Sequence, residues 1–571
     1  MEHIKAVGWL NDSQADLAFI GGKIRTPAHP SGFASALAVR GGVIQALGRD
    51  EDIRDLTGPG TRVVDLRGRL ALPAFGDAHV HPVGGGLESL RCNLLGLRTR
   101  PEYLDVIAAY CAALPPDAWV LGGGWTMAAF PRGTPVAADL DAVTGGRPAF
   151  LPNRDHHSAW VNTAALTISG VDADTPDPQD GRIERDEAGR PAGALHDGAM
   201  RLVAAHVPPV SADELTAGLL AAQAYLHSLG ITRWQDACVG AAGELGIPDA
   251  FDTYCRAAAD GLLTGHAVGA LWWDRSRGLD QIDDLLARRE RAMRVAAGDG
   301  RFRATTVKLM VDGVCETFTA AMSAPYLDRH GDLSGHRGNL FIEPEVLSEA
   351  TRRLAAAGFQ LHFHAIGDRA VAVALDTLEA LPAAQRRAAR HHLAHLQFIA
   401  PGDLARFRAL EAVANFQPLW AHVDAQMTEF TVPFVGAERA SWQYLIGSLA
   451  RAGTRLAFGS DWPVSSADPL QEIHVAVNRV LSERLGHRGE PETEDPFLPG
   501  EAITVQAAID AFTRGVAWVN HSEDVAGALA PGMHADLVVL DQDLFAIPAA
   551  YIGSTSVVMT AASGKVVFGD E

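Results

Sequence analysis

Two histidines two positions apart are the residues of this sequence best suited to chemistry. His79 and His81 end an apolar segment, Ala71–His81, that we predict to be a buried strand. Side chains at positions i and i+2 of a strand leave the same face, so both imidazoles can bind one metal ion. Such a pair also occurs as two interior histidines with ordinary hydrogen bonds. The metal interpretation therefore depends on other ligand-type residues reaching the same place.

Four such residues, His364, His395, Asp461 and Lys308, stand near the ends of other strand-like segments. Eight apolar segments bounded by turn residues are predicted strands: Ala71–His81, Ile231–Val239, Leu262–Trp273, Ala304–Gly313, Phe359–Asp368, His391–Ile399, Val413–Trp420 and Arg455–Val464. From the second onward they alternate with helix-like stretches, which is typical of a parallel sheet. Eight βα units predict an α/β fold, the (β/α)₈ TIM barrel. In that barrel chemistry is placed at the carboxyl ends of the strands, where these residues fall.

Helix signals agree with this alternation. Ser211 and Glu214 form a predicted capping box for a helix that runs to Gly230. A second helix is predicted from Pro344 to Gly358, directly before the segment that carries His362 and His364.

The two ends of the chain share a sequence pattern of short predicted strands joined by hairpin glycines. Neither end has enough strands to bury a face alone, so we predict one small β-sandwich built from residues 1–70 and 525–571. Residues 71–524 would form the barrel. Within it, residues 82–209 are far too long for an ordinary βα connection and form a predicted insertion, placed to act as a lid.

Composition excludes several classes of partner. The 571 residues are 47% apolar and carry a net charge of −21, from 48 basic and 69 acidic side chains, so neither nucleic acid nor an anionic membrane is an expected partner. No apolar stretch reaches 18 residues, and the first five residues lack a signal-peptide core, so we expect a cytoplasmic protein. Five cysteines without CxxC spacing favour reduced thiols. We expect a homodimer.

Several motifs together resemble the amidohydrolase superfamily, in the branch of YtcJ-like proteins and N-substituted formamide deformylases. The resemblance spans nearly the whole chain and is carried by Leu72–His81, His157–Asn162, Val307–Gly313, His364–Ala370, His395, Gln417–Pro418, Gly459–Val464 and Pro531–Leu540. It implies a hydrolase of non-peptide C–N bonds that uses one or two divalent metals.

The same resemblance implies roles for individual residues. His79 and His81 would bind one metal, His364 and His395 the other, and Asp461 would ligate metal and handle the proton. Lys308 would bridge the metals as an N-carboxylated lysine. A plain ammonium about 4 Å from a divalent ion would be repelled by about 8 kcal/mol at an effective dielectric of 20, so Lys308 fits only if neutral or carboxylated. Ala74, Gly76 and Ala394 depart from the family pattern, and Ala394 stands where many relatives have Glu.

Plainer interpretations exist for several residues. His362 and His391 are expected to be core histidines, Asp368 a helix cap, and Lys308 is alternatively a snorkelling lysine paired with Asp312. His157 and Gln417 are candidates to hold an oxyanion or orient the substrate, although histidines in the insertion are as often structural. Large amphipathic side chains near predicted loops either line a substrate pocket or pack the lid: Trp125, Trp160, Trp420 and Trp462.

The predicted reaction is metal-assisted hydrolysis of a small-molecule amide, with an N-substituted formamide as one candidate substrate. Three or more imidazoles with carboxylates suit zinc, and manganese or iron as well. A cyclic-amide, carbamate or ester hydrolase on the same site is the nearest alternative. A catalytically silent metal-binding barrel is the alternative of a different class, and the cost of burying so many ionisable groups without metal argues against it.

Overall fold

Eight parallel strands form the centre of the molecule in the computed structural model, which describes residues 14–29, 31–240, 248–295, 300–485 and 495–569. In sheet order they are β8 (Phe75–Val80), β15 (Ile231–Val239), β16 (His266–Trp272), β17 (Phe302–Met310), β18 (Gln360–Ala365), β19 (His392–His395), β20 (Val413–Phe416) and β21 (Leu456–Phe458). This order follows the sequence, as the predicted barrel requires.

The sheet closes where the loop after β21 meets β8. The Asp461 backbone N–H donates to the carbonyl of His79 at 2.7 Å, and the His81 N–H donates to the carbonyl of Trp462 at 2.9 Å. A Cβ on Gly459 would lie 2.4 Å from the His79 nitrogen, so only glycine permits this approach. The α/β barrel prediction is confirmed.

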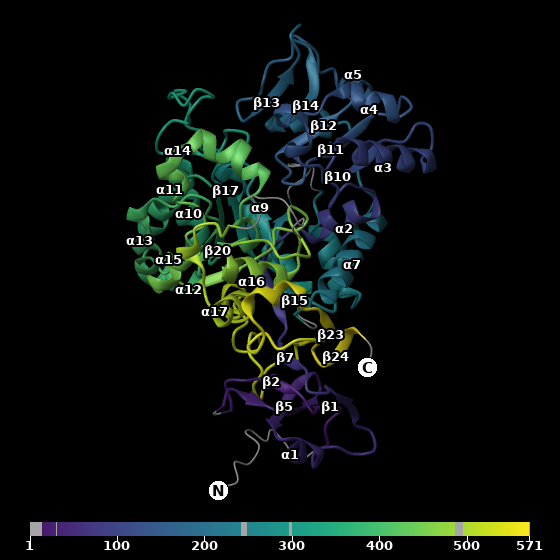
Figure 1. The fold of residues 1–571 in the computed structure, drawn as a ribbon, viewed down its shortest axis with the longest axis vertical. Helices are drawn as coiled ribbons and strands as arrows, with labels where there is room; N and C mark the ends of the chain where they lie inside the picture. Colours follow the sequence, from purple (N-terminus) through teal and green to yellow (C-terminus); the bar gives the residue numbers. More distant parts are fainter. Residues whose placement is uncertain (1–13, 30, 241–247, 296–299, 486–494, 570–571) are drawn as a thin grey trace.

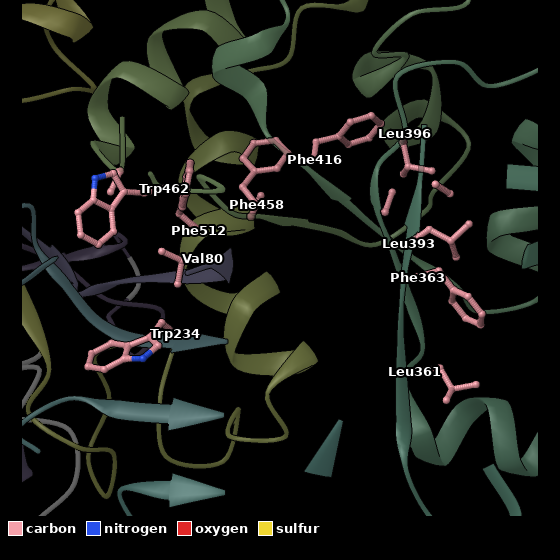
Figure 2. Packing of buried hydrophobic residues seen from close by; sticks show 14 of the residues in the cluster. Val80, Trp234, Leu361, Phe363, Leu393, Leu396, Phe416, Phe458, Trp462 and Phe512 are labelled. Atoms are coloured by element: carbon pink, nitrogen blue, oxygen red, sulfur yellow. The ribbon is translucent and has the colours of Figure 1, made fainter. Parts of the chain in front are cut away.

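Helices fill the connections between consecutive strands and cover the outside of the barrel (Figure 1). The principal ones are α7 (Ala212–Ser228), α8 (Phe251–Ala259), α9 (Ile282–Val295), α10 (Pro344–Ala356), α11 (Asp368–Glu379), α13 (Leu404–Ala409), α15 (Ile446–Arg451) and α16 (Pro469–Asn478). The predicted capping box is present, because Ser211 Oγ accepts from the Glu214 N–H and the Glu214 carboxylate accepts from the Ser211 N–H. Figure 2 shows part of the buried apolar core, including Phe363, Leu393 and Phe416 from three neighbouring strands.

The first predicted strand is corrected by the structure, because Ala71–His81 is two strands in two sheets. β7 (Leu70–Pro73) pairs with β22 (Leu537–Leu540) outside the barrel, and the chain then enters the barrel as β8. β7 lies in a six-stranded sheet with β2 (Lys23–Arg25), β3 (Phe33–Ala34), β22, β23 (Val557–Ala562) and β24 (Lys565–Phe568). A four-stranded sheet of β1 (Leu17–Ile20), β4 (Ala36–Arg40), β5 (Val43–Gly48) and β6 (Arg62–Asp65) shares a core with it. Strands from both ends of the chain therefore meet.

The segment after β8 forms a separate layer at the end of the barrel opposite that sandwich (Figure 1). After α2 (Pro82–Leu90), its sheet contains β9 (Cys92–Asn93), β10 (Val120–Gly123), β11 (Ala149–Pro152), β12 (Ser158–Val161), β13 (Gly181–Arg185) and β14 (Pro191–Asp197). Helices α3 (Arg100–Ala113), α4 (Ala137–Val143) and α5 (Thr163–Ser169) pack beside the sheet. This layer carries the residues of the predicted lid.

The predictions about a membrane-spanning segment and a signal peptide concern different parts of the chain. None of the helices within the described ranges has the length and apolarity needed to span a bilayer. The first five residues, on which the prediction about a signal peptide depends, lie outside those ranges.

Candidate active site

Six predicted residues gather at the carboxyl end of the barrel. They come from five places along the chain: His79 on β8 with His81 just after it, Lys308 on β17, His364 on β18, His395 at the end of β19, and Asp461 in the loop after β21. Parallel pairing brings them together, because β17 sets Met310 opposite His364 and β18 sets Ala365 opposite His395. All six line one cavity.

Asp461 is the centre of this group. Its Oδ1 lies 2.8 Å from His81 Nε2 and 3.2 Å from His79 Nε2, and its Oδ2 lies 3.8 Å from His395 Nδ1. Lys308 Nζ lies 3.3 Å from His79 Nε2. The ligand atoms of His79, His81 and Asp461 all fall within 4.8 Å of one another, which one metal ion can bridge.

Two of these side chains, His395 and Asp461, are carried by a backbone in a strained conformation. His395 has φ +73° and Asp461 has φ +57°, in the left-handed region that residues with a Cβ seldom adopt. The His395 N–H donates to Gln417 Oε1 at 3.0 Å, which helps to hold the unusual backbone. Strain of this kind is characteristic of functional sites and persists only where neighbouring contacts enforce it.

The buried imidazoles are suited to bind a metal because they are neutral. Burial, followed by the charge of Lys308, lowers the pKa of His79 to about 3. Burial also lowers the pKa of His364 and His395 well below 6.5. Burial by itself raises the pKa of Asp461, but the adjacent His79 and His81 lower it by more, so the group is a carboxylate at neutral pH.

Unpartnered buried atoms show that a metal fits this donor set. Both ring nitrogens of His395 are buried, and neither has a hydrogen-bond partner within the described part of the chain; the same holds for Nδ1 of His81. Leaving such groups unsatisfied is costly, so a ligand that takes them up is expected. Four imidazoles, a carboxylate and an amine suit zinc, manganese or iron.

The insertion contributes a histidine to the cavity. His157 Nδ1 contacts Asp197 Oδ1 at 2.6 Å, and its ring centroid lies 5.9 Å from that of His364. Asp197 is itself strained, with φ +46° and ψ −121°. Burial alone would lower the pKa of His157, but the Asp197 carboxylate raises it by more, so this pKa lies above its ordinary value.

The rest of the cavity wall is mostly apolar. Trp420 stacks on His395 at 5.3 Å between ring centroids, with 2° between the ring planes. The complete lining consists of His79, His81, Asp155, His156, His157, Trp272, Lys308, Met310, Val314, His364, Ile366, His395, Trp420, Asp461 and Val464. Apart from Lys308 and the histidines, none of the described residues that line the cavity is basic.

Comparison with known proteins places this geometry in a family. The family model described as "Amidohydrolase family" matches residues 62–568. The chain belongs to the amidohydrolase family. The putative amidohydrolase YtcJ of Bacillus subtilis is 30% identical over 96% of this chain and 98% of its own length. The N-substituted formamide deformylase of Arthrobacter pascens is 27% identical over 92% of this chain and 94% of its own.

A solved structure and a plant relative resemble this amidohydrolase over similar lengths. An uncharacterized metal-dependent hydrolase from Pyrococcus furiosus has a TM-score of 0.67 at 26% identity and covers 92% of this chain and 99% of its own. The Arabidopsis thaliana protein LONG AFTER FAR-RED 3 is 31% identical over 97% of this chain and 92% of its own length. Together with the donor set, these findings support a metal-dependent hydrolase.

Four residues predicted to bind substrate are not brought to the cavity wall of the amidohydrolase. Trp125 and Trp160 lie in the core of the insertion, where their ring nitrogens donate to the carbonyls of Leu151 and Val136. The Trp462 ring packs against Tyr225 at 5.0 Å, outside the cavity. Gln417 holds the His395 backbone and also lies off the wall. The sequence shows that these side chains are large or polar but not which way they face.

The alternative interpretation of Lys308, a snorkelling lysine paired with Asp312, does not fit the structure. The Asp312 carboxylate accepts the backbone N–H groups of Ala321, Ile366 and Gly367 instead. Lys308 is only 3% exposed and does not snorkel to solvent.

A second cluster of potential ligands lies at the opposite, amino end of the barrel. It consists of His266, His534 and Asp536. Arg233 already donates to Asp536 Oδ2 at 2.8 Å and to His534 Nδ1 at 2.7 Å. A guanidinium in this position disfavours a second cation, so the cluster is not a metal site.

Proposed function

We propose that this protein hydrolyses neutral, apolar N-substituted amides, with N-substituted formamides as the first candidates. One observation carries the proposal: the Asp461 carboxylate stands within 3.2 Å of the imidazoles of His79 and His81, in a cavity whose remaining wall is mostly apolar. This combines a metal-binding, proton-accepting floor with a wall that favours an uncharged substituent. The similarity to a formamide deformylase supports the same choice.

The polar residues divide the chemistry between them. His79, His81, His364, His395 and Asp461 would hold one or two divalent ions, with Lys308 as a carboxylated bridge. Such ions, when bound, lower the pKa of a water molecule and polarise a carbonyl. Asp461 accepts the proton of the attacking water. The same carboxyl then returns the proton to the departing nitrogen, which an amide needs because an amide anion is a very poor leaving group.

Residues around the metal site orient the substrate. His157, held by Asp197, donates a hydrogen bond to the substrate oxygen, on which negative charge develops. Trp272 and Trp420, which line the cavity, contact the N-substituent. Because no arginine is among the described residues of the wall, a carboxylate on the substrate finds no bidentate partner there, so N-acyl amino acids and dipeptides are disfavoured.

A substrate panel tests the proposal. Metal-free enzyme, prepared with a chelator, is reloaded with Zn²⁺, Mn²⁺ or Fe²⁺ and assayed with N-benzylformamide, N-benzylacetamide, benzyl formate, a benzyl carbamate, N-formylphenylalanine and a dipeptide. We expect metal-dependent turnover of the neutral amides that exceeds turnover of the charged ones. Faster turnover of the ester or of the charged substrates would contradict the proposed substrate class. Full metal loading without turnover of any compound would favour a silent barrel.

A further inference from the structure

The structure separates two buried histidines that look alike in sequence. His391 Nδ1 accepts the backbone N–H of Leu361 at 3.0 Å and touches none of the proposed ligands. His362, which is fully buried, instead contacts a ligand directly, because its Nε2 lies 2.9 Å from His79 Nδ1. A neutral imidazole carries one proton on one of its two nitrogens. The partner of His79 Nδ1 therefore decides whether His79 Nε2, on the cavity side, has a lone pair for a metal.

The starting point is the side-chain amide of Gln360, whose orientation is fixed by the backbone. Its Nε2 lies 3.0 Å from the Arg390 carbonyl and 2.7 Å from the Val519 carbonyl. Carbonyl oxygens only accept, so the amide nitrogen must face them. Gln360 Oε1 consequently faces the barrel interior, where it accepts from Thr306 Oγ1 at 2.8 Å.

The orientation of Gln360 fixes that of Gln235. The Gln235 amide contacts Gln360 Oε1 at 3.1 Å, and this contact requires Gln235 to present its nitrogen; the same nitrogen lies 3.0 Å from Asn520 Oδ1. Gln235 Oε1 then faces His362 Nδ1 at 2.7 Å. Because Gln235 Oε1 can only accept a hydrogen bond, His362 Nδ1 must carry a proton and donate it to this bond.

The last step passes from His362 to His79. Among the residues that the structure describes, His362 has no carboxylate as a hydrogen-bond partner, and a buried charged ring without one is costly, so the ring is neutral. With its proton on Nδ1, His362 offers a bare Nε2, which accepts a hydrogen bond from the Nδ1–H of His79. His79 Nε2 is then unprotonated, and it lies 3.3 Å from Lys308 Nζ. It also lies 3.2 Å from Asp461 Oδ1, so two acceptor atoms face each other there, which a metal ion held between them would stabilise.

We propose that Gln360, Gln235 and His362 form a relay that fixes the tautomer of His79 and keeps its Nε2 lone pair ready for metal. His362 and Gln235 are positioning residues, because they act through His79 and line no part of the cavity. The inference rests on the proposed metal site and not on the choice of substrate. Partners behind a ligand of this kind typically change metal affinity by about 10- to 100-fold.

The direct test reads the tautomer without turnover. Metal-free enzyme labelled with [¹⁵N]histidine gives ring-nitrogen shifts that distinguish protonated from bare nitrogens, and the His79→Asn and His362→Gln variants assign the signals. We expect protons on Nδ1 of both His79 and His362. A proton on Nε2 of His79 in the wild-type protein would overturn the relay.

Metal titration against a competing chromophoric chelator supplies the second test. Gln235→Leu and His362→Leu should weaken metal binding by about 10- to 100-fold. His362→Gln should retain it within about threefold, because its amide oxygen can still accept from His79 Nδ1. The matched control is His391→Leu, which removes an equally buried histidine and should leave metal affinity unchanged.

The two proposals fail in different ways. Equal losses of affinity in His362→Leu and His391→Leu would reduce the role of His362 to packing and overturn the relay. A wild-type protein that binds no divalent metal would instead overturn the proposed function, whatever the tautomer of His79.

Discussion

Gln417→Leu separates two roles for a residue that the sequence placed near the substrate. In the structure Gln417 is 1% exposed, and its Oε1 accepts the His395 N–H at 3.0 Å. Its amide nitrogen lies 3.4 Å from Asn415 Oδ1, and Asn415 is itself oriented by donating to the Ala78 carbonyl. The side-chain oxygen of Gln417 is therefore directed to the backbone of His395, so it holds a proposed metal ligand and not the substrate.

The size of the effect follows from the atoms left behind. Leucine leaves the buried His395 N–H without an acceptor, which costs about 1–3 kcal/mol. Residues held at unusual φ, here His395 at +73° and Leu396 at +53°, each store about 1–3 kcal/mol, so the loss favours relaxation of this backbone. Relaxation turns the His395 ring away from the site. Because 1.4 kcal/mol is a factor of ten, we expect metal affinity to fall by about 10- to 100-fold.

Two measurements check this prediction. Urea unfolding of the metal-free protein reports stability, and chelator competition reports the metal Kd. Gln471→Leu is the control, because Gln471 is equally buried and donates to the Gly553 carbonyl at 2.7 Å, but it lies off the cavity wall. It should lose stability with unchanged metal affinity. Unchanged metal affinity in Gln417→Leu together with a 10²- to 10³-fold lower kcat would refute our reasoning and restore the oxyanion role.

Five further substitutions have distinct expected results. Asp461→Asn should keep its fold and lower kcat by about 10²- to 10⁴-fold, measured on fully loaded enzyme; near-normal kcat would contradict proton transfer by Asp461. Lys308→Ala should lower metal content by elemental analysis, with partial rescue of activity by acetate, whereas unchanged content would mean that Lys308 bridges nothing. Trp125→Ala should lower the free energy of unfolding by about 3–5 kcal/mol with little change in KM, and Trp420→Ala should raise KM; the reverse pattern would put Trp125 at the substrate. Burial lowers the pKa of His391 to about 3, so as pH falls below about 6.5 the unfolded chain binds a proton at His391 that the folded protein does not, and stability is lost. Between pH 7 and pH 5 this loss is about 2 kcal/mol, and His391→Leu should remove it. An unchanged loss of stability over this range, measured by urea titration, would contradict the prediction.

The sequence by itself determined the barrel and the choice of ligand-type residues. Alternating strand and helix signals specify a parallel sheet, and a parallel sheet gathers the residues that end its strands at one edge. His79, His81, Lys308, His364, His395 and Asp461 therefore meet even though almost 400 residues separate the first from the last. The strand β15, Ile231–Val239, was predicted with the bounds that it has in the structure. These features depend on local periodicity, which a single sequence carries.

Some boundaries and side-chain directions were decided only by tertiary structure. β7 and β8 read as one apolar run, because both strands are buried and only their partners, β22 and β15, differ. Trp125 and Trp420 are equally large, yet one fills the insertion and the other stacks on His395. A side chain faces a core or a cavity according to the elements packed against it, and this information is absent from its local sequence.

The roles of His362 and Gln417 were likewise beyond the sequence. Both act through hydrogen bonds to residues on other strands, His79 and His395, so their roles depend on the register of strands far apart in the chain. The left-handed backbone at His395 and Asp461 is equally non-local, because neighbouring contacts must enforce it. Residue types and spacing determine which ligands are present. The packing of distant strands decides how each ligand is oriented, because hydrogen-bond direction exists only once those strands are in place.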